Sequence, residues 1–395
     1  MIRPDFIPQV PYGTKDILPL DAARKRDMEN ELAKLFLAWG YKEVITPTFE
    51  YHETLKAGAP DAPDDNAFRF FDRNGRMLAL RPDMTTPIAR VAVMRMKDYP
   101  LPLRLFYLAN VFRQEEAQAG RQCEFYQAGV ELLGTGGIAA DAEVVALAVE
   151  SLLAAGLTDF QVCLGQVDFI SGIMSEAGLD ATTGHRVKQA LVDRNMVGLA
   201  ELLEECQMEP GIKKLLQQLP MLHGKKEMLQ EVRERVKNKI SQAALDNLAE
   251  IYGLLENYGI DRYVMFDLGI IRDFDYYTGM VFETYTSGLG YPICGGGRYD
   301  RMAAAFGRER PATGFALGIE RVLMALERQG LDTTEPARST YVGWAEGQLT
   351  QAIAEVRRLR AESEIAELGL QEQTREMAEN DSILRGCNRC IYIDQ

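Results

Sequence analysis

A row of polar side chains interrupts an apolar part of the sequence at residues 266–283. The row consists of Arg272, Asp273, Asp275, Tyr276 and Tyr277. The runs on either side are rich in β-branched and aromatic residues, which predicts a strand, a tight turn and a second strand. Buried polar groups need partners. The row therefore indicates either a binding site for a polar ligand or an internal network whose members hydrogen-bond to one another.

Segments 272–279, 295–300 and 314–321 carry motifs that resemble those of histidyl-tRNA synthetases, in the same order. The first, Arg-Asp-Phe-Asp-Tyr-Tyr-Thr-Gly, is similar to the histidine-binding signature of that family. The second, Gly-Gly-Gly-Arg-Tyr-Asp, resembles its glycine loop, and the third resembles motif 3 of the class II synthetases. The resemblance covers about residues 9 to 330. It is closer still to a paralogous family, the synthetase-like regulatory subunits of ATP phosphoribosyltransferase, which no longer charge tRNA.

The resemblance implies a pocket for free histidine. In that pocket Asp83, Thr85 and Gln127 would accept hydrogen bonds from the ammonium group of the ligand. Arg113 and Arg272 would hold its carboxylate, because a guanidinium can bind a carboxylate through two parallel hydrogen bonds. All five residues are assigned by their match to the family motifs.

The imidazole ring has two different nitrogens, and each needs its own partner. By the same resemblance, Glu131 and Tyr277 would pair with the ring, and Tyr276 would lie next to them. A site built from such groups discriminates strongly, since a ligand that lacks the matching groups leaves them unpaired. No metal, cofactor or catalytic residue is expected in this pocket.

Each of these residues also has a purely structural interpretation. Arg113 could pair with Glu115 along a strand, and Asp83 could cap the helix that follows it. The two tyrosines could be core aromatics, and the glycines at 295–297 could form only a bend in the sheet. The ligand interpretation is preferred because all of these residue types occur together, in the order of the family motifs.

The residues that would activate histidine with ATP depart from the synthetase pattern in three places. Asp83 and Met84 stand where synthetases have Glu-Gly, so that a thioether replaces a glycine next to the ligand. The loop at 114–124 carries three acids and one base where the family has basic residues facing ATP and tRNA, and lost cationic charge weakens nucleic-acid binding. The part of the chain after Pro336 is much shorter than the anticodon-binding domain of the synthetases.

Arg113 and Arg321 still match the motif arginines of the class II enzymes, which leaves ATP binding open. The resemblance therefore implies a regulatory subunit of ATP phosphoribosyltransferase without catalysis of its own. Such a subunit would be required for the first step of histidine biosynthesis and for its feedback control by histidine. Its expected partners are the short-form catalytic subunit, histidine as effector and a second copy of itself within a hetero-oligomer, without tRNA.

Two alternatives stay open. The chain could be an active histidyl-tRNA synthetase with a reduced C-terminal domain, which would catalyse histidine-dependent ATP–pyrophosphate exchange. It could also be a synthetase-like ligase that moves histidine onto something other than tRNA, which would catalyse exchange without charging tRNA.

The composition, with 47% hydrophobic and 26% charged residues in 395, is that of an ordinary globular protein. The formal net charge of −14 weighs against a nucleic-acid partner. No apolar run approaches the ~20 residues of a membrane span, and the first residues do not resemble a signal peptide, so we expect a cytoplasmic protein. Cys387 and Cys390 have the spacing of a metal or redox pair, but without a second pair a zinc site is not expected.

Hydrophobic periodicity predicts the elements that would position the pocket. An apolar stripe at 28–39 predicts a helix, which together with an edge strand at 44–46 resembles class II motif 1 and implies a homodimer. Strands at 103–111 and 124–131 resemble the antiparallel pair of motif 2. A helix is also predicted at 142–155, with Asp141 as its cap.

The expected fold is α/β (α+β), with a class II synthetase-like antiparallel sheet flanked by helices. Residues 1–330 would form this core, with a helical insertion at 170–260. Residues 336–395 predict a small C-terminal α/β unit of strand, helix and strand. Asn74 and Gly75 predict a type I′ hairpin turn within the core.

Overall fold

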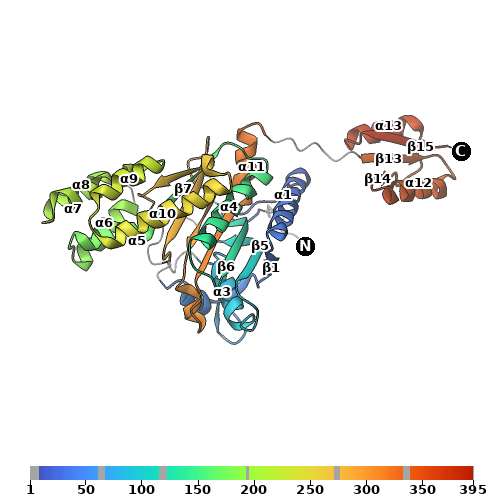
Figure 1. Ribbon diagram of the computed structural model, residues 1–395. Coiled ribbons are helices and arrows are strands. Elements are labelled where there is room, and N and C mark those ends of the chain that lie inside the picture. Colours follow the sequence, from blue (N-terminus) through green and yellow to red (C-terminus); the bar gives the residue numbers. More distant parts are fainter. Residues whose placement is uncertain are drawn as a thin grey trace. The chain divides into compact units, whose positions relative to one another are not determined.

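A sheet of nine strands is the centre of the first of two units, Met1–Asp332 and Thr333–Gln395 (Figure 1). The computed structural model describes residues 9–60, 67–114, 122–192, 195–270, 276–331 and 339–394. The strand order is β1-β5-β6-β12-β11-β10-β7-β9-β8, in which β1–β5 and β7–β9 are parallel and the other neighbours antiparallel. The strands are β1 (Lys42–Glu43), β5 (Leu103–Phe112), β6 (Glu124–Leu133), β7 (Phe160–Gln166), β8 (His223–Gly224), β9 (Val264–Asp267), β10 (Met280–Thr286), β11 (Cys294–Arg298) and β12 (Ala312–Gly318).

The edge strand β1 lies two residues earlier in the chain than the sequence predicts. Val44 still donates its backbone N–H to the carbonyl of Phe106 at 2.9 Å. Pairing ends there, because Ile45 is 85% exposed and Pro47 has no N–H to donate. The predicted strand pair β5–β6, by contrast, is confirmed.

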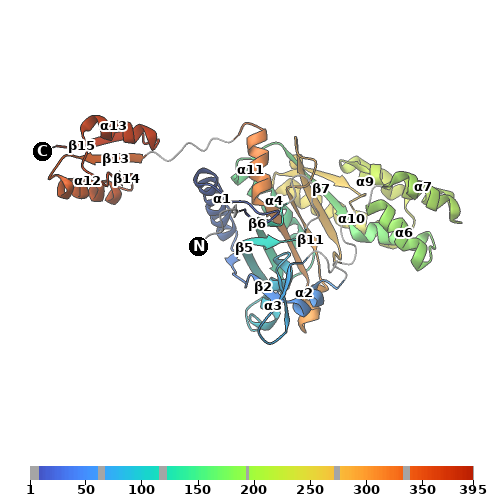
Figure 2. The ribbon, with the colours of Figure 1, turned by 180° about the vertical axis from the view of Figure 1, so that it is seen from behind.

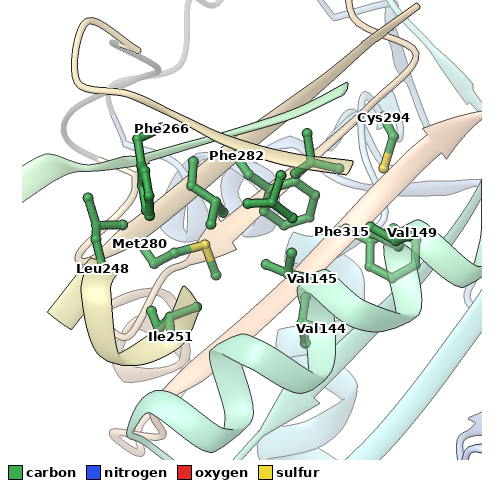
Figure 3. Packing of buried hydrophobic residues seen from close by; sticks show 14 of the residues in the cluster. Val144, Val145, Val149, Leu248, Ile251, Phe266, Met280, Phe282, Cys294 and Phe315 are labelled. Atoms are coloured by element: carbon green, nitrogen blue, oxygen red, sulfur yellow. The ribbon is translucent and has the colours of Figure 1, made fainter. Parts of the chain in front are cut away.

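Four helices cover one face of this sheet: α1 (Pro19–Ala38), α4 (Ile138–Ala154), α10 (Lys239–Asn257) and α11 (Ile319–Arg328). Figure 3 shows Val145 of α4, Leu248 of α10, and Phe282 and Phe315 of the sheet meeting in one apolar cluster. Almost the whole of α4 is buried, because it packs against the sheet on one side and against α1 and α10 on the others. The mixed fold with a mainly antiparallel sheet flanked by helices is therefore confirmed.

The opposite face of the sheet is covered by α3 (Thr85–Met94) and a short 3₁₀ helix, η4 (Met302–Phe306). Met84, Ile88, Tyr107 and Met302 belong to the apolar cluster beneath them. Next to α3 lie α2 (His52–Gly58) and a small antiparallel sheet, as Figure 2 shows from behind. The small sheet has the order β2 (Phe49–Tyr51), β4 (Met77–Leu80) and β3 (Arg69–Phe71).

The hairpin between β3 and β4 is confirmed, but its turn is not of type I′. That turn needs positive φ at both central residues, whereas here Gly75 (φ 76°) has positive φ and Asn74 does not. The Asp72 carboxylate accepts the backbone N–H groups of Asn74 (2.8 Å) and Arg76 (2.9 Å). These two bonds favour an ordinary turn closed by a left-handed glycine.

Residues between about 170 and 260 are largely helical, as the sequence predicts. Gly172 lets α5 approach α10 closely, so that the Ser241 hydroxyl donates to the carbonyl of Phe169 at 2.7 Å. The short strand β8, which the sequence does not predict, adds an edge to the main sheet through β9. No helix of the described residues is long and apolar enough to cross a membrane. The remaining helices are α5 (Val167–Glu176), α6 (Ala181–Val192), α7 (Met196–Glu205), α8 (Pro210–Gln218) and α9 (Lys226–Arg235), with short 3₁₀ turns η2 (Leu219–Met221) and η3 (Asp261–Tyr263).

The second unit is a parallel three-stranded sheet with the order β14-β13-β15. It contains one strand and one helix that the sequence does not predict, β14 and α13. The strand β14 (Ile365–Leu368) is only four residues long, with Ala366 and Leu368 packed in the core. The helix α13 (Arg375–Leu384) buries only small side chains, Ala378 and Ser382. Its elements are β13 (Ser339–Trp344), α12 (Leu349–Ala361), β14 (Ile365–Leu368), α13 (Arg375–Leu384) and β15 (Arg389–Ile393).

A buried ion pair ties the start of α4 to the end of β11. The Arg298 guanidinium donates to both carboxylate oxygens of Asp141, at 2.8 and 3.1 Å, and a third bond at 3.0 Å reaches Asp300. The helix begins at Ile138 with Gly137 as its cap, so the prediction that Asp141 caps it is wrong. Asp141 lies inside the first turn and is 2% exposed, because it is the counter-ion of Arg298.

Replacing Asp141 with Ala is expected to lower the free energy of unfolding by about 3 kcal/mol, because Arg298 then keeps a buried charge with fewer partners. Urea denaturation followed by circular dichroism measures this. The matched control is Asp246→Ala, which removes the exposed pair with Arg233 and should change stability by less than about 1 kcal/mol. Equal losses in the free energy of unfolding for Asp141→Ala and Asp246→Ala would contradict the conclusion that the buried ion pair stabilises the fold.

Candidate functional site

Gln127 and Glu131 lie on the same face of β6, because they are separated by an even number of residues. Ala109 and Gly318 flank Gln127 on the neighbouring strands, and Gly314 lies beside Glu131. A side chain at Gly314 would overlap the carboxyl group of Glu131. Small neighbours therefore leave room for polar groups in the middle of the sheet.

The same arrangement continues on the next strand. Gly297 of β11 pairs with Gly314, and a Cβ atom at Gly297 would lie 2.8 Å from the ring of Tyr277. The glycines at 295–297 have regular partners on both β10 and β12, so the alternative that they form a bend is wrong. Gly297 lets the Tyr277 ring lie directly on the sheet.

Glu131 is the most deeply buried acid of this group, with 2% of its surface exposed. It accepts a hydrogen bond from the Tyr299 hydroxyl and forms a side-chain hydrogen bond with Thr85. Burial raises the pKa of Glu131 to about 8, and the nearby charge of Asp83 acts in the same direction. The carboxyl group is therefore mainly protonated at neutral pH.

Three tyrosine rings pack around this carboxyl group. The Tyr276 ring lies 4.8 Å from that of Tyr277 and 5.7 Å from that of Tyr299, measured between centroids. Burial, followed by the neighbouring Tyr277 and Asp83, raises the pKa of Tyr276 well above its ordinary value, so its hydroxyl stays neutral. Tyr276 also packs against the apolar cluster under α3, so its structural interpretation holds in part.

Asp83 and Arg113 lie at the edge of this polar group. Asp83 accepts the backbone N–H of Thr86 at 3.1 Å, as the capping alternative predicts. Arg113 donates to the carbonyl of Pro82 at 2.9 Å and lies 5.4 Å from the ring of Phe125. Burial raises the pKa of Asp83, while the Thr86 N–H and the Arg113 charge lower it in part.

Gln127 has a buried hydrogen-bond acceptor without a donor in the part of the chain that the structure describes. Its side-chain oxygen Oε1 is buried and accepts no hydrogen bond from any residue in the described ranges. Almost all buried acceptors in folded proteins are paired. A donor from a bound molecule would complete this one.

The structure thus brings Thr85, Glu131, Tyr276 and Tyr277 into one cluster, with Asp83, Arg113 and Gln127 nearby on the same side of the sheet. Arg272 lies outside the described residues, as do Asp273, Asp275 and most of the acidic loop at 115–121. Within the described ranges, no group of three or more His, Cys, Asp and Glu side chains is placed to hold a metal ion.

Sequence reasoning assigned no ligand role to two tyrosines of this cluster, Tyr107 and Tyr299. Tyr299 lies within the glycine motif at 295–300, next to Arg298, and this position was the one sequence signal that pointed to a role in the site. Tyr107 looks like any core aromatic of a strand, and only its register opposite Gly129 places it here. Met84 is 1% exposed and belongs to the apolar cluster under α3.

Residues 13–322 match the histidyl-tRNA synthetase family. A regulatory subunit of ATP phosphoribosyltransferase from Desulforamulus reducens is 42% identical over 383 residues, which is 97% of this chain and 95% of the relative. The same subunit from Moorella thermoacetica is 44% identical over 382 residues, or 96% and 97% of the two chains.

Solved structures agree with these relatives. A Bacillus halodurans chain described as an ATP phosphoribosyltransferase regulatory subunit/histidyl-tRNA synthetase has a TM-score of 0.88 at 33% identity, with 99% of both chains covered. A histidyl-tRNA synthetase from a Nostoc species has a TM-score of 0.85 at 20% identity, covering 99% of this chain and 92% of its own, which shows the fold alone. The predicted class II synthetase-like fold is confirmed.

The free energy of unfolding is expected to fall as the pH rises from about 4.5 to 8. Glu131 ionises near its ordinary value of 4.5 in the unfolded chain but only near 8 in the folded one. Between these values the folded state binds more protons, so this group contributes a loss of at most about 1.4 kcal/mol per pH unit. Urea denaturation of the ligand-free protein across this range measures the slope.

Glu131→Gln removes the titrating group and should remove this part of the slope. Glu201→Gln, a change at an exposed acid, is the matched control and should keep the wild-type slope. An unchanged slope in Glu131→Gln would show that the Glu131 carboxyl group ionises at an ordinary pH.

Proposed function

Because this chain belongs to the family of ATP phosphoribosyltransferase regulatory subunits, which has the histidyl-tRNA synthetase fold, we propose that it controls that enzyme by binding free histidine. The chain itself would carry out no catalysis. Its partner would be the short-form catalytic subunit, which joins ATP to phosphoribosyl pyrophosphate. The observation that carries the proposal is the unpaired acceptor of Gln127, on the same face of β6 as the buried Glu131–Tyr299 pair.

The polar cluster suits the three parts of histidine. The unpaired Oε1 of Gln127 and the carboxylate of Asp83 would accept the ammonium, and Arg113 would hold the carboxylate. Glu131 would pair with the imidazole, which is a neutral partner for an acid that is itself mainly neutral. Thr85 and Tyr277 would hold Glu131 and the ring in place, with Tyr276 behind them and Arg272 as a second partner for the carboxylate.

Loss of catalysis fits the residues that replace the synthetase pattern. Met84 fills the apolar cluster under α3 at a position where synthetases have a glycine. The sequence of loop 114–124 lacks the surplus of cations that phosphates require. A chain that keeps the amino-acid contacts without these groups would bind histidine and would not activate it.

A homodimer within the hetero-oligomer is part of the proposal. Large apolar side chains are exposed on the small sheet β2-β4-β3, where Phe71 is 67% exposed, and just after β1, where Ile45 is 85% exposed. The Phe49 and Phe70 rings lie 5.9 Å apart on this sheet. Exposed apolar groups of this kind mark protein interfaces.

Regulation requires that histidine bind one arrangement of the complex more tightly than another. The coupling between the histidine pocket and the catalytic subunit is then a free energy, typically about 1–3 kcal/mol. The Tyr276 ring contacts Tyr277, in the segment just before β10, and Tyr299, in the segment just after β11. A ligand among these rings would therefore bias how the two strands and their loops pack.

Calorimetric titration with histidine is expected to show binding that falls at least about tenfold in Glu131→Ala, because a hydrogen bond to a polar ligand group is lost. Gln127→Leu should weaken binding as well, through loss of the ammonium acceptor. The exposed-site control Glu201→Ala should bind as the wild type does. Undiminished affinity in both pocket variants would exclude the pocket as the histidine site.

In a reconstituted assay, histidine is expected to lower the rate of the catalytic subunit only when this chain is present. The purified chain alone should show no histidine-dependent ATP–pyrophosphate exchange above a no-enzyme blank. Robust exchange together with tRNA charging would identify an active histidyl-tRNA synthetase. Exchange without tRNA charging would identify a different ligase. Either result would refute the regulatory proposal.

A further inference from the structure

Arg310 is a buried cation without a counter-charge among the residues that the structure describes. Its surface is 4% exposed, and its Nη1 nitrogen has no hydrogen-bond partner. Removing a guanidinium from water is unfavourable unless an anion or several acceptors take the place of the water. Arg298, another buried arginine, has such anions, since its guanidinium pairs with the carboxylates of Asp141 and Asp300.

The backbone holds Arg310 in a defined place. The residue after it, Pro311, disfavours helical geometry at Arg310 and so keeps it extended. The Pro311 carbonyl accepts the N–H of Gly134 at 2.7 Å, and the N–H of Ala312 donates to Asp300 at 2.9 Å. The unpaired Nη1 of Arg310 therefore belongs to an anchored segment at the start of β12.

A second arginine adds to the positive charge at this place. Arg308 reaches the carbonyl of Lys97, in the loop after α3, at 3.4 Å. Burial lowers the pKa of Arg310, and the charge of Arg308 lowers it further. Glu309 lies between the two arginines in sequence but forms no ion pair with either in the part of the chain that the structure describes. Two like charges that form no ion pair with a described acid favour an anion that bridges them.

We propose that Arg308 and Arg310 form a binding site for a small oxyanion of the phosphate class, between the η4–β12 connection and the loop after α3. A guanidinium binds phosphate through two parallel hydrogen bonds, and two arginines match an anion with several equivalent oxygens. The site shares no residue with the polar cluster around Glu131. It would give this acidic chain, with a net charge of −14, a local place for an anionic ligand.

Thermal unfolding of Arg310→Met tests the site, because methionine keeps the apolar stem and removes the charge. In chloride buffer the variant is expected to melt at or above the wild-type temperature, since an unpaired buried charge has been removed. Added inorganic phosphate should raise the melting temperature of the wild type by at least about 2 °C and leave the variant unchanged. Arg357→Met, at an exposed arginine, should behave as the wild type.

Two outcomes of this experiment would overturn the proposal. A large drop in the melting temperature of Arg310→Met without phosphate would mean that Arg310 already has a structural partner. Equal phosphate shifts in the wild type and in Arg310→Met would mean an adventitious ion only.

Calorimetry at constant ionic strength identifies the anion. Phosphate affinity is expected to fall at least tenfold in Arg310→Met, less in Arg308→Met, and not in Arg357→Met. Tighter binding of acetate than of phosphate would overturn the assignment to the phosphate class. Sedimentation tests whether a carboxylate of a second copy pairs with Arg310 instead, and weaker self-association in Arg310→Met without any phosphate effect would also overturn the proposal.

Discussion

Close approach of side chains to glycine backbone is the constraint on which the centre of this protein depends. The carboxyl group of Glu131 and the ring of Tyr277 occupy space that side chains at Gly314 and Gly297 would fill. The hydroxyl of Tyr107 lies in the same way against Gly129. Three adjacent strands, β6, β12 and β11, thus each have a glycine on this face of the sheet, and this floor of bare backbone leaves room for the buried polar groups.

The polar groups on this floor are buried mainly in their neutral forms. Burial raises the pKa values of Glu131, Tyr276 and Tyr299, so that the tyrosine hydroxyls and the Glu131 carboxyl group form hydrogen bonds without full charges. A neutral network is far less unfavourable to bury than isolated ions. The arginines show the contrast: Arg298 is buried with two carboxylates, and Arg310 is buried without an anion among the described residues.

The buried polar cluster around Glu131 fits a family of regulatory subunits. A regulator needs an amino-acid site whose occupancy changes the preferred packing of the surrounding elements, and it does not need groups that stabilise a reacting phosphate. The tyrosines join segments on both sides of β10 and β11, and Met84 anchors α3 through apolar contacts. The proposed contacts with histidine and the packing contacts therefore involve the same few residues.

The sequence by itself determined many of the strands and helices and the types of residue in the site, because hydrophobic periodicity and short motifs are local. It could not determine that Asp141 is the counter-ion of Arg298, since the two residues meet only when α4 lies on β11. It also missed β14, which is only four residues long, and α13, which buries only small side chains.

Tertiary structure alone decided which polar residues share one interior. The strand register sets Tyr107 opposite Gly129 and Glu131 beside Gly314, and burial, which no local pattern encodes, sets the protonation of the group. The same burial distinguishes Arg310 from the exposed arginines of the chain. Residue types were readable from the sequence, whereas their partners and charges depend on which strands become neighbours.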